Sequence, residues 1–352
     1  GRGIDQILAA PADPTLHEPY VRDAREYVKL AEQTNGPIPR GAPPAYIWGD
    51  LPDVLEEQEP DLRIGNLETS ITRSDDYARE KGIHYRMSPG NVDVLQPPAF
   101  DCLTLANNHV LDWGTEGLTE TLDTLDRRSI GHCGAGRTRE EAEAPCDRPA
   151  TSGMPATVWG IGDRSSGIPR GWAAGDDTRG VWLKGADRDL LRRVEGSGPR
   201  IVSIHWGENW GYAIPARQQN LARALIDRAG VSIVHGHSSH HPRGMEIYNG
   251  GLILYGAGDF INDYEGIGGH ERYRPDLTAG YFVDLDEARA HVTRVLAVPF
   301  RLRRFHLQRA SAADTEWLAE TLQAASPAGG VRCRAVDGPA IDCSAAHRSG
   351  GG

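Results

Sequence analysis

The chain has 352 residues, 39% of them hydrophobic, and it carries 38 Lys and Arg against 49 Asp and Glu, a formal net charge of −11. This length supplies enough apolar material for one large or two ordinary domains. The acidic balance argues against a nucleic-acid partner, because nucleic-acid binding needs a basic footprint. No apolar run approaches the length of a membrane span.

Hydrophobic periodicity predicts that helices and strands alternate along most of the chain. In the first part we expect a helix over residues 22–32 and a turn region rich in Pro and Gly over 36–44. A second helix over 48–58 and a strand over 61–68 follow. A charged loop over residues 69–89 follows, and we expect it to fold over a site. Leu118, Leu122 and Leu125 recur at helical spacing and predict a helix over residues 115–128.

The middle of the chain has the pattern of a strand–helix–strand unit. Strands are expected over residues 155–161 and 201–206, and the helix over 216–229 ends before Gly230. A β-branched run starts at Val231, directly after this helix. The strands on either side of the helix are therefore expected to be neighbours or near-neighbours in one sheet.

The last part adds a strand over 251–261, an antiparallel pair over 279–286 and 291–303, and a short amphipathic helix over 311–323. From residue 326 the composition turns to Ala, Gly, Ser and Pro. We therefore predict one domain over residues 1–310, a C-terminal helix over 311–325 and a flexible tail over 326–352.

Four of the expected strands end in side chains that bind metals or move protons. The most informative segment is 231–242, where an apolar run stops in His235, His237, His240 and His241. The other three strands end in His205, in Asn107-Asn108-His109 and in Glu68. Because ligands in α/β folds lie beyond the carboxyl ends of strands, we expect one shared site at this rim.

These segments, in this order, carry a family resemblance. Gly-Arg-Gly-Ile-Asp, Asn-Leu-Glu-Thr, Leu-Ala-Asn-Asn-His-Val-Leu-Asp, Ile-His-Trp-Gly, Gly-His-Ser-Ser-His and Tyr-Gly-Ala-Gly-Asp-Phe follow one another. Over residues 1 to about 305 the chain resembles the CapA-type family of poly-γ-glutamate capsule synthesis, a branch of the calcineurin-like metallophosphatase superfamily. The resemblance implies an α/β fold of two packed mixed β-sheets flanked by helices, an α/β/β/α sandwich.

The resemblance also implies roles for residues at the strand ends. Glu68 stands at the position of a metal-bridging carboxylate, Asn108 at that of a metal ligand and His109 at that of a proton donor. His205 and His237 match two further metal ligands. In the family motif Gly-His-x-His, a second histidine ligand follows the first after one residue. Here two serines separate His237 from His240, so the resemblance leaves either Ser239 or His240 at this ligand position.

The start of the chain departs from the family pattern, in which a strand ending in Gly-Asp comes before Gly-Arg-Gly. Here the sequence opens at Gly1-Arg2-Gly3. The resemblance therefore predicts a strand and a carboxylate ahead of Gly1 that this sequence does not contain. Asp5 is the nearest acid.

The donor set of His, Asn and carboxylate, without thiolate, suits a divalent Mn, Fe, Zn or Ca ion. Two residues are further catalytic candidates. Asp112 either orients His109 or starts the following helix, and Arg2 either binds an anion or is merely exposed. Trp113, Trp206 and Trp210 are expected to form flat walls for a substrate, with ordinary packing as the alternative. His235 is equally compatible with a site or a core position.

These features favour a protein that makes or handles poly-γ-glutamate or a related peptide polymer, by metal-assisted attack on an amide, ester or phosphate. One alternative is a peptide epimerase that uses His/Asp acid–base pairs, and another is a non-catalytic capsule assembly or export factor. Other capsule-synthesis proteins are expected partners. A cytoplasmic location is favoured, with association with the cell envelope as the alternative. For the five cysteines, reduced thiols are favoured, although Cys133 with Cys146 and Cys333 with Cys343 are possible pairs.

Overall fold

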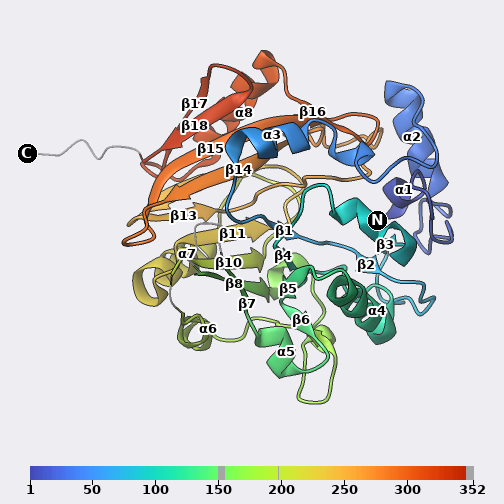
Figure 1. Ribbon diagram of the computed structural model, residues 1–352, viewed down its shortest axis with the longest axis horizontal. Helices are drawn as coiled ribbons and strands as arrows, with labels where there is room; N and C mark the ends of the chain where they lie inside the picture. The colour runs from blue at the N-terminus through green and yellow to red at the C-terminus, as the bar shows by residue number, and fades with distance from the viewer. Residues whose placement is uncertain (150–154, 197, 346–352) are drawn as a thin grey trace, which may run out of the picture.

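The computed structural model describes residues 1–149, 155–196 and 198–345, and it shows sheets packed between outer helices (Figure 1). The largest sheet has six strands in the order β12-β13-β11-β10-β8-β7. A second sheet has the order β14-β15-β18-β17, with β16 added to β15, and a third has the order β1-β4-β5. The predicted α/β architecture of packed sheets flanked by helices is confirmed.

The six-stranded sheet combines parallel and antiparallel strands. Its members are β7 (Cys146–Pro149), β8 (Pro155–Gly162), β10 (Arg200–His205), β11 (Ile233–His237), β12 (Met245–Tyr248) and β13 (Gly251–Leu254). Strands β8, β10, β11 and β13 run parallel to one another, and β7 and β12 close the sheet as antiparallel edges. The expected neighbours β10 and β11 pair directly, with His205 opposite His237.

Helix α7 shows how the sequence builds the unit between β10 and β11. It spans Ala216–Ala229 and buries Leu221, Leu225 and Ile226 against the six-stranded sheet. Each such aliphatic side chain contributes about 2 kcal/mol when fully removed from water. Gly230 ends the helix with φ +62°, a left-handed conformation that glycine adopts without a Cβ penalty. The chain then turns directly into β11.

The other two sheets both pack on the six-stranded sheet. One consists of β1 (Ile64–Asn66), β4 (Cys102–Thr104) and β5 (Gly131–Cys133), and β4 and β5 share a core cluster with β8 and β10. The other contains β14 (Leu277–Leu285), β15 (Val292–Leu302), β16 (Leu307–Arg309), β17 (Arg332–Val336) and β18 (Ala340–Ser344). Val295, Ala297 and Cys343 of this sheet share one core cluster with β12, β13 and helix α8 (Ala312–Ala325). Leu296, Val298 and Phe300 of β15 belong to a different core cluster.

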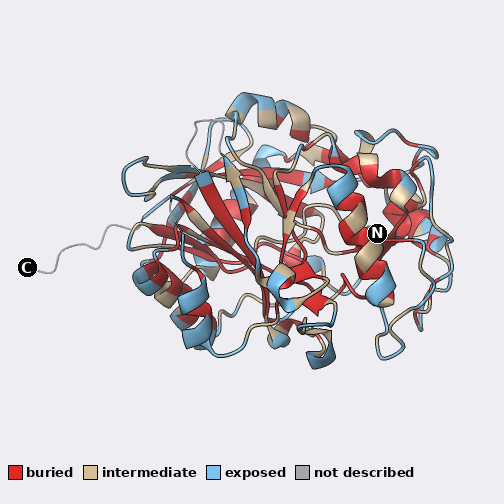
Figure 2. Cartoon of the chain, turned by 60° about the horizontal axis from the view of Figure 1, so that its bottom comes forward, coloured by how far each residue is buried: buried red, intermediate tan, exposed pale blue. Residues whose placement is uncertain are grey.

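Helices and short strands complete the layers. The helices are α1 (Arg2–Asp5), α2 (Arg25–Asn35), α3 (Leu51–Gln58), α4 (Gly114–Arg127), α5 (Arg139–Glu143) and α6 (Asp187–Arg193). Two-stranded ribbons join β2 (Ser70–Ile71) to β3 (Arg86–Met87) and β6 (Ala135–Gly136) to β9 (Gly180–Val181). Figure 2 shows the strands mostly buried and the outer helices exposed on one side, as amphipathic helices on a sheet require. No helix in the described ranges has both the length and the apolarity to span a bilayer.

A cleft of about 680 Å³ separates β1 from β14. Among the described strands, β1 pairs only with β4 and β14 only with β15, so each has one free edge. The cleft is lined by residues of both strands, reaches Gly1, and contains Ile201, Ile233 and Leu254 of the six-stranded sheet.

The predicted flexible tail over residues 326–352 is wrong for residues 332–344, which form the β17–β18 hairpin. Cys333, Ile341 and Cys343 alternate with polar residues and are buried against the sheet and α8. The small-residue composition of the whole segment obscured this short alternation around the turn at 337–339. Residues 346–352 lie outside the described residues. The expected C-terminal helix is present as α8, whereas the division of the chain into domains stays a prediction.

Candidate active site

Four strand ends meet at one rim, where the structure brings Glu68, Asn108, His205 and His237 together. The His205 Nε2 lies 3.1 Å from the Asn108 Oδ1 and 3.7 Å from the Glu68 Oε1. The His205 Nδ1 lies 2.8 Å from the His237 Nδ1. The parallel β10–β11 register places the two histidines directly opposite each other. These four side chains therefore share one polar cluster, in which His205 and His237 are buried and Glu68 and Asn108 are partly exposed.

The chemistry of this cluster suits a divalent cation, but its geometry is that of a hydrogen-bonded network. Burial lowers the pKa of His205 and His237 well below the usual range, which keeps both imidazoles in the neutral form that binds metals. Burial raises the pKa of Glu68 to about 7. In the described part of the chain, no three His, Cys, Asp or Glu side chains form a ready-made metal cage. Metal binding would require His205 and His237 to exchange their mutual hydrogen bond for the ion.

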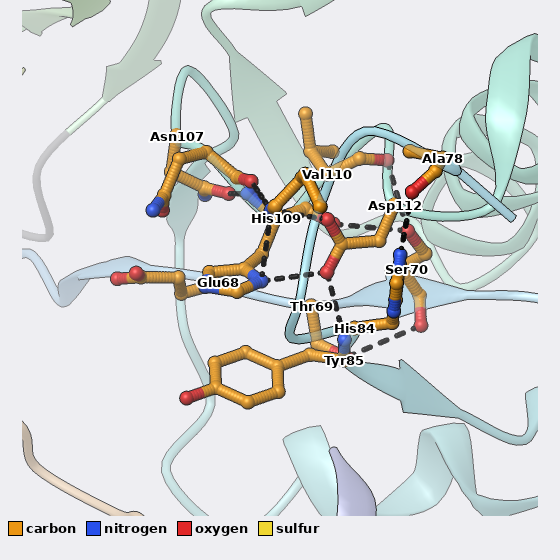
Figure 3. Close-up of polar contacts among 12 residues, drawn as sticks. Glu68, Thr69, Ser70, Ala78, His84, Tyr85, Asn107, His109, Val110 and Asp112 are labelled. Atoms are coloured by element: carbon orange, nitrogen blue, oxygen red, sulfur yellow. Dashed lines mark hydrogen bonds and ion pairs between the residues drawn. The ribbon is translucent and has the colours of Figure 1, made fainter. Parts of the chain in front are cut away.

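Beside this cluster, His109 forms a buried pair with Asp112 (Figure 3). The His109 Nδ1 lies 2.6 Å from an Asp112 carboxylate oxygen, and the backbone N–H of Tyr85 donates to the same oxygen at 2.7 Å. Lys81 donates to Asp112 and to the carbonyl of Asn108. Burial opposes ionisation of Asp112, but His109 and Lys81 outweigh it and lower the pKa of this carboxyl. Asp112 therefore orients His109.

A second His–carboxylate pair lines the cleft. The His240 Nδ1 lies 2.9 Å from the Asp259 carboxylate, and Glu68 is a second acidic partner that favours the charged form of this imidazole. Burial disfavours the charged form of His240, but Asp259 outweighs burial and raises the pKa of this imidazole. The Ser239 hydroxyl donates to the carbonyl of His241. Among the described residues, no hydrogen bond joins Ser239 or His240 to Glu68, Asn108, His205 or His237, and which of the two occupies the shifted ligand position stays a prediction.

Two tyrosines connect the two His–Asp pairs. The ring of Tyr85 stacks on His109 with 3.9 Å between centroids, and its hydroxyl contacts that of Tyr264. The Tyr264 hydroxyl lies 3.4 Å from the His240 Nε2. Sequence reasoning did not identify Tyr85, Tyr264 or Lys81. The only signal was the charged loop over residues 69–89, which does reach the site through Lys81 and Tyr85.

Comparison with known proteins identifies the family of this chain. Residues 1–264, three quarters of the chain, match the model of the bacterial capsule synthesis protein PGA_cap. The chain belongs to this family.

Two kinds of relatives agree with the family match. The chain is 43% identical to a probable polyglutamine synthesis accessory protein of Mycobacterium tuberculosis, over 94% of this chain and 90% of the relative. It is 31% identical to the PGA biosynthesis protein CapA of Bacillus subtilis, over 58% of this chain and 53% of that protein. The predicted CapA-type family membership is confirmed.

The expected catalytic role of Arg2 is not supported in this PGA_cap family member. The Arg2 side chain is buried, and its guanidinium donates to Glu18 at 2.8 Å and to Asp263 at 2.8 Å. It also donates to the Tyr27 hydroxyl and lies over the Tyr27 ring. Because two carboxylates already neutralise Arg2, it is not available to bind a substrate anion; it ties α1 to distant segments of the chain.

Two of the three tryptophans that were expected to form substrate walls lie in the core. Trp113 and Trp206 are 1% and 2% exposed, and their indole N–H groups donate to the carbonyls of Tyr85 and Tyr255. Both therefore pack in the core, which was the alternative reading. Trp210 is partly exposed, stacks on His270 with 3.8 Å between centroids and lies 5.4 Å from the His240 ring, so its role as a substrate wall stays a prediction.

The buried histidines predict that the protein loses stability in mild acid. Burial lowers the pKa of His109, His235 and His241 to about 4. An imidazole in the unfolded chain titrates near ~6.5, so below that pH the unfolded state binds more protons than the folded state. Each such histidine should remove up to about 1.4 kcal/mol of stability per pH unit between ~6.5 and ~4.

The measurement is the melting temperature at pH 8, 7, 6, 5 and 4.5 at constant ionic strength. We expect a plateau above pH 7 and a progressive fall below ~6.5. His235→Asn should reduce the slope, because burial lowers the pKa of His235 and its ring contacts the Ser203 hydroxyl. A melting temperature that stays constant between pH 7 and pH 5 would contradict the buried neutral state of these imidazoles.

Proposed function

We propose that this chain acts in the synthesis or processing of poly-γ-glutamate or a related peptide polymer, through metal-assisted hydrolysis or transfer at an amide, ester or phosphate. The observation that supports this most directly is the convergence of Glu68, Asn108, His205 and His237 beside the His109–Asp112 pair. The names of relatives from Mycobacterium tuberculosis and Bacillus subtilis support the polymer class.

The proposal gives each group a role. Glu68, Asn108, His205 and His237 would hold a divalent ion, which supplies Lewis-acid polarisation or an activated water when bound. His109 moves a proton at its Nε2, because its Nδ1 is engaged by Asp112. Lys81 and Asp112 fix the orientation of this imidazole. Burial of His205, His237 and the His109–Asp112 pair strengthens these electrostatic interactions.

The test measures the release of new amino groups from poly-γ-glutamate, with Mn, Fe, Zn or Ca added in turn to metal-free protein. His205→Asn should reduce both metal content and metal-dependent turnover at least about 100-fold, because it removes one ligand of the cluster. The matched control is His132→Asn, since His132 pairs with Asp126 and does not line the cleft. Turnover that is equal with and without metal would overturn the metal-assisted mechanism.

The second candidate function is epimerisation of a peptide residue. It is favoured by the presence of two His–Asp pairs, His109–Asp112 and His240–Asp259, connected by Tyr85 and Tyr264. Two acid–base groups are what removal and return of a Cα proton require. Entry of solvent deuterium into a peptide Cα without chain cleavage would support it. Binding of the polymer with neither activity would instead favour an assembly or export factor that acts with other capsule-synthesis proteins.

A further inference from the structure

The C-terminal hairpin places two cysteines opposite each other. Cys333 of β17 and Cys343 of β18 are direct partners in the antiparallel register. Both are free thiols, and both are buried in the core cluster under α8. No part of the candidate active site contains either residue. The pair therefore requires an explanation that is separate from the proposed function.

The hydrogen bonding of the hairpin shows whether Cys333 and Cys343 form a hydrogen-bonded or a non-hydrogen-bonded antiparallel pair. The backbone N–H of Cys333 donates to the Gln323 Oε1 at 2.9 Å and thus points away from β18. On the other side of its strand, Cys343 is in register with Val295 of β15. Cys333 and Cys343 therefore form a non-hydrogen-bonded pair, in which the Cα atoms of opposite residues are about 4.5 Å apart and the side chains approach most closely.

This spacing lies within the range of roughly 4.4–6.8 Å that disulfides bridge between Cα atoms. We propose that Cys333 and Cys343 are a redox-modifiable pair that forms a cross-strand disulfide when the chain meets a thiol–disulfide oxidant. The bond would close a ring around the turn at residues 337–339. It would fasten β17, an edge strand, to β18, which pairs with β15.

The reaction balances as two exchanges with a small-molecule disulfide such as oxidised glutathione. The Cys333 thiolate attacks one sulfur of the oxidant, which forms a mixed disulfide and releases one glutathione thiolate. The Cys343 thiolate then attacks the Cys333 sulfur and releases the second glutathione. The two protein thiols lose two electrons and two protons, and the oxidant gains them. The neighbouring Cys333 thiol and burial raise the pKa of Cys343, so the exchange is expected during folding or local opening rather than in the closed hairpin.

A second group of cysteines provides an internal control. Cys102 and Cys133 have their sulfur atoms 3.9 Å apart, but they lie on neighbouring parallel strands and are two residues out of register. Cys146 belongs to the same core cluster. None of these three has a partner directly opposite, so we expect all three to remain thiols under the conditions that oxidise the hairpin.

The experiment refolds the full chain in a glutathione redox buffer and titrates thiols in denaturant. The count should fall from five to three, and peptide mapping without reductant should recover residues 333 and 343 in one cross-linked species lighter by two hydrogens. The oxidised protein should melt roughly 5 °C higher than the reduced one, since the bond limits the unfolded chain. Cys343→Ser should abolish this shift, whereas Cys133→Ser should retain it.

Two results would overturn the proposal. One is five free thiols after refolding with the oxidant; the other is a cross-link that maps to Cys102, Cys133 or Cys146. Mapping of the wild-type chain decides between these outcomes even where a serine variant fails to fold. Neither result bears on the proposed function, because no polymer substrate or metal enters the assay.

Discussion

Replacement of His109 by alanine is expected to lower turnover of a poly-γ-glutamate substrate about 10²–10⁴-fold, while bound metal stays near the wild-type level. The reason is that His109 is held by Asp112 at 2.6 Å and is not among the four side chains that meet at His205. Its removal takes away a proton carrier without removing a proposed ligand. Metal content and turnover are measured on the same preparation, by elemental analysis and by amine release.

Two variants make this result specific to the imidazole. His132→Ala removes a histidine that pairs with Asp126, and it should leave turnover within about twofold of wild type. Lys81→Met removes the group that donates to Asp112 and to the Asn108 carbonyl, so it should lower turnover less than His109→Ala does. If His109→Ala lost its metal but retained wild-type turnover per bound ion, His109 would be a ligand and the assigned role would be wrong.

The rim of the sheets was predictable because its signal is local in sequence. An apolar run that ends in His205 or His237 predicts that the imidazole lies at the carboxyl end of a strand. Parallel neighbouring strands then bring these ends to one edge of the sheet. The same holds for α7, whose apolar spacing and terminal Gly230 are contained in 15 consecutive residues. In such segments the backbone pattern determines the position of the functional side chain.

The partners of these residues were not predictable, because they come from distant segments. Tyr85 meets Tyr264 across 179 positions, and Arg2 meets Asp263 across 261 positions. No periodicity indicates that a carboxylate far along the chain will neutralise an arginine between two glycines. Burial of Trp113 and Trp206 likewise depends on which backbone carbonyls the fold brings to their indole N–H groups. These tertiary contacts explain why the roles predicted for Arg2, Trp113 and Trp206 differ from those in the structure.

The buried Arg2 cluster gives the largest expected effect on stability. Arg2→Ala should lower the free energy of unfolding by about 3–5 kcal/mol, because it leaves Glu18 and Asp263 buried without their cation. All three side chains are buried: the exposed fraction is 2% for Arg2, 1% for Glu18 and 7% for Asp263. The measurement is the midpoint and slope of urea denaturation, supported by the melting temperature.

An exposed ion pair of the same chemistry is the matched control. Arg25 contacts Asp23, but its side chain is 63% exposed, so Arg25→Ala should shift the urea midpoint far less than Arg2→Ala does. The double variant Arg2→Met, Asp263→Asn should be more stable than Arg2→Ala. It removes both charges of the Arg2–Asp263 ion pair and so leaves Asp263 without an uncompensated buried charge. If Arg2→Ala abolished turnover while the urea midpoint stayed at the wild-type value, Arg2 would belong to the catalytic machinery. Its ion pairs with Glu18 and Asp263 would then be dispensable for folding.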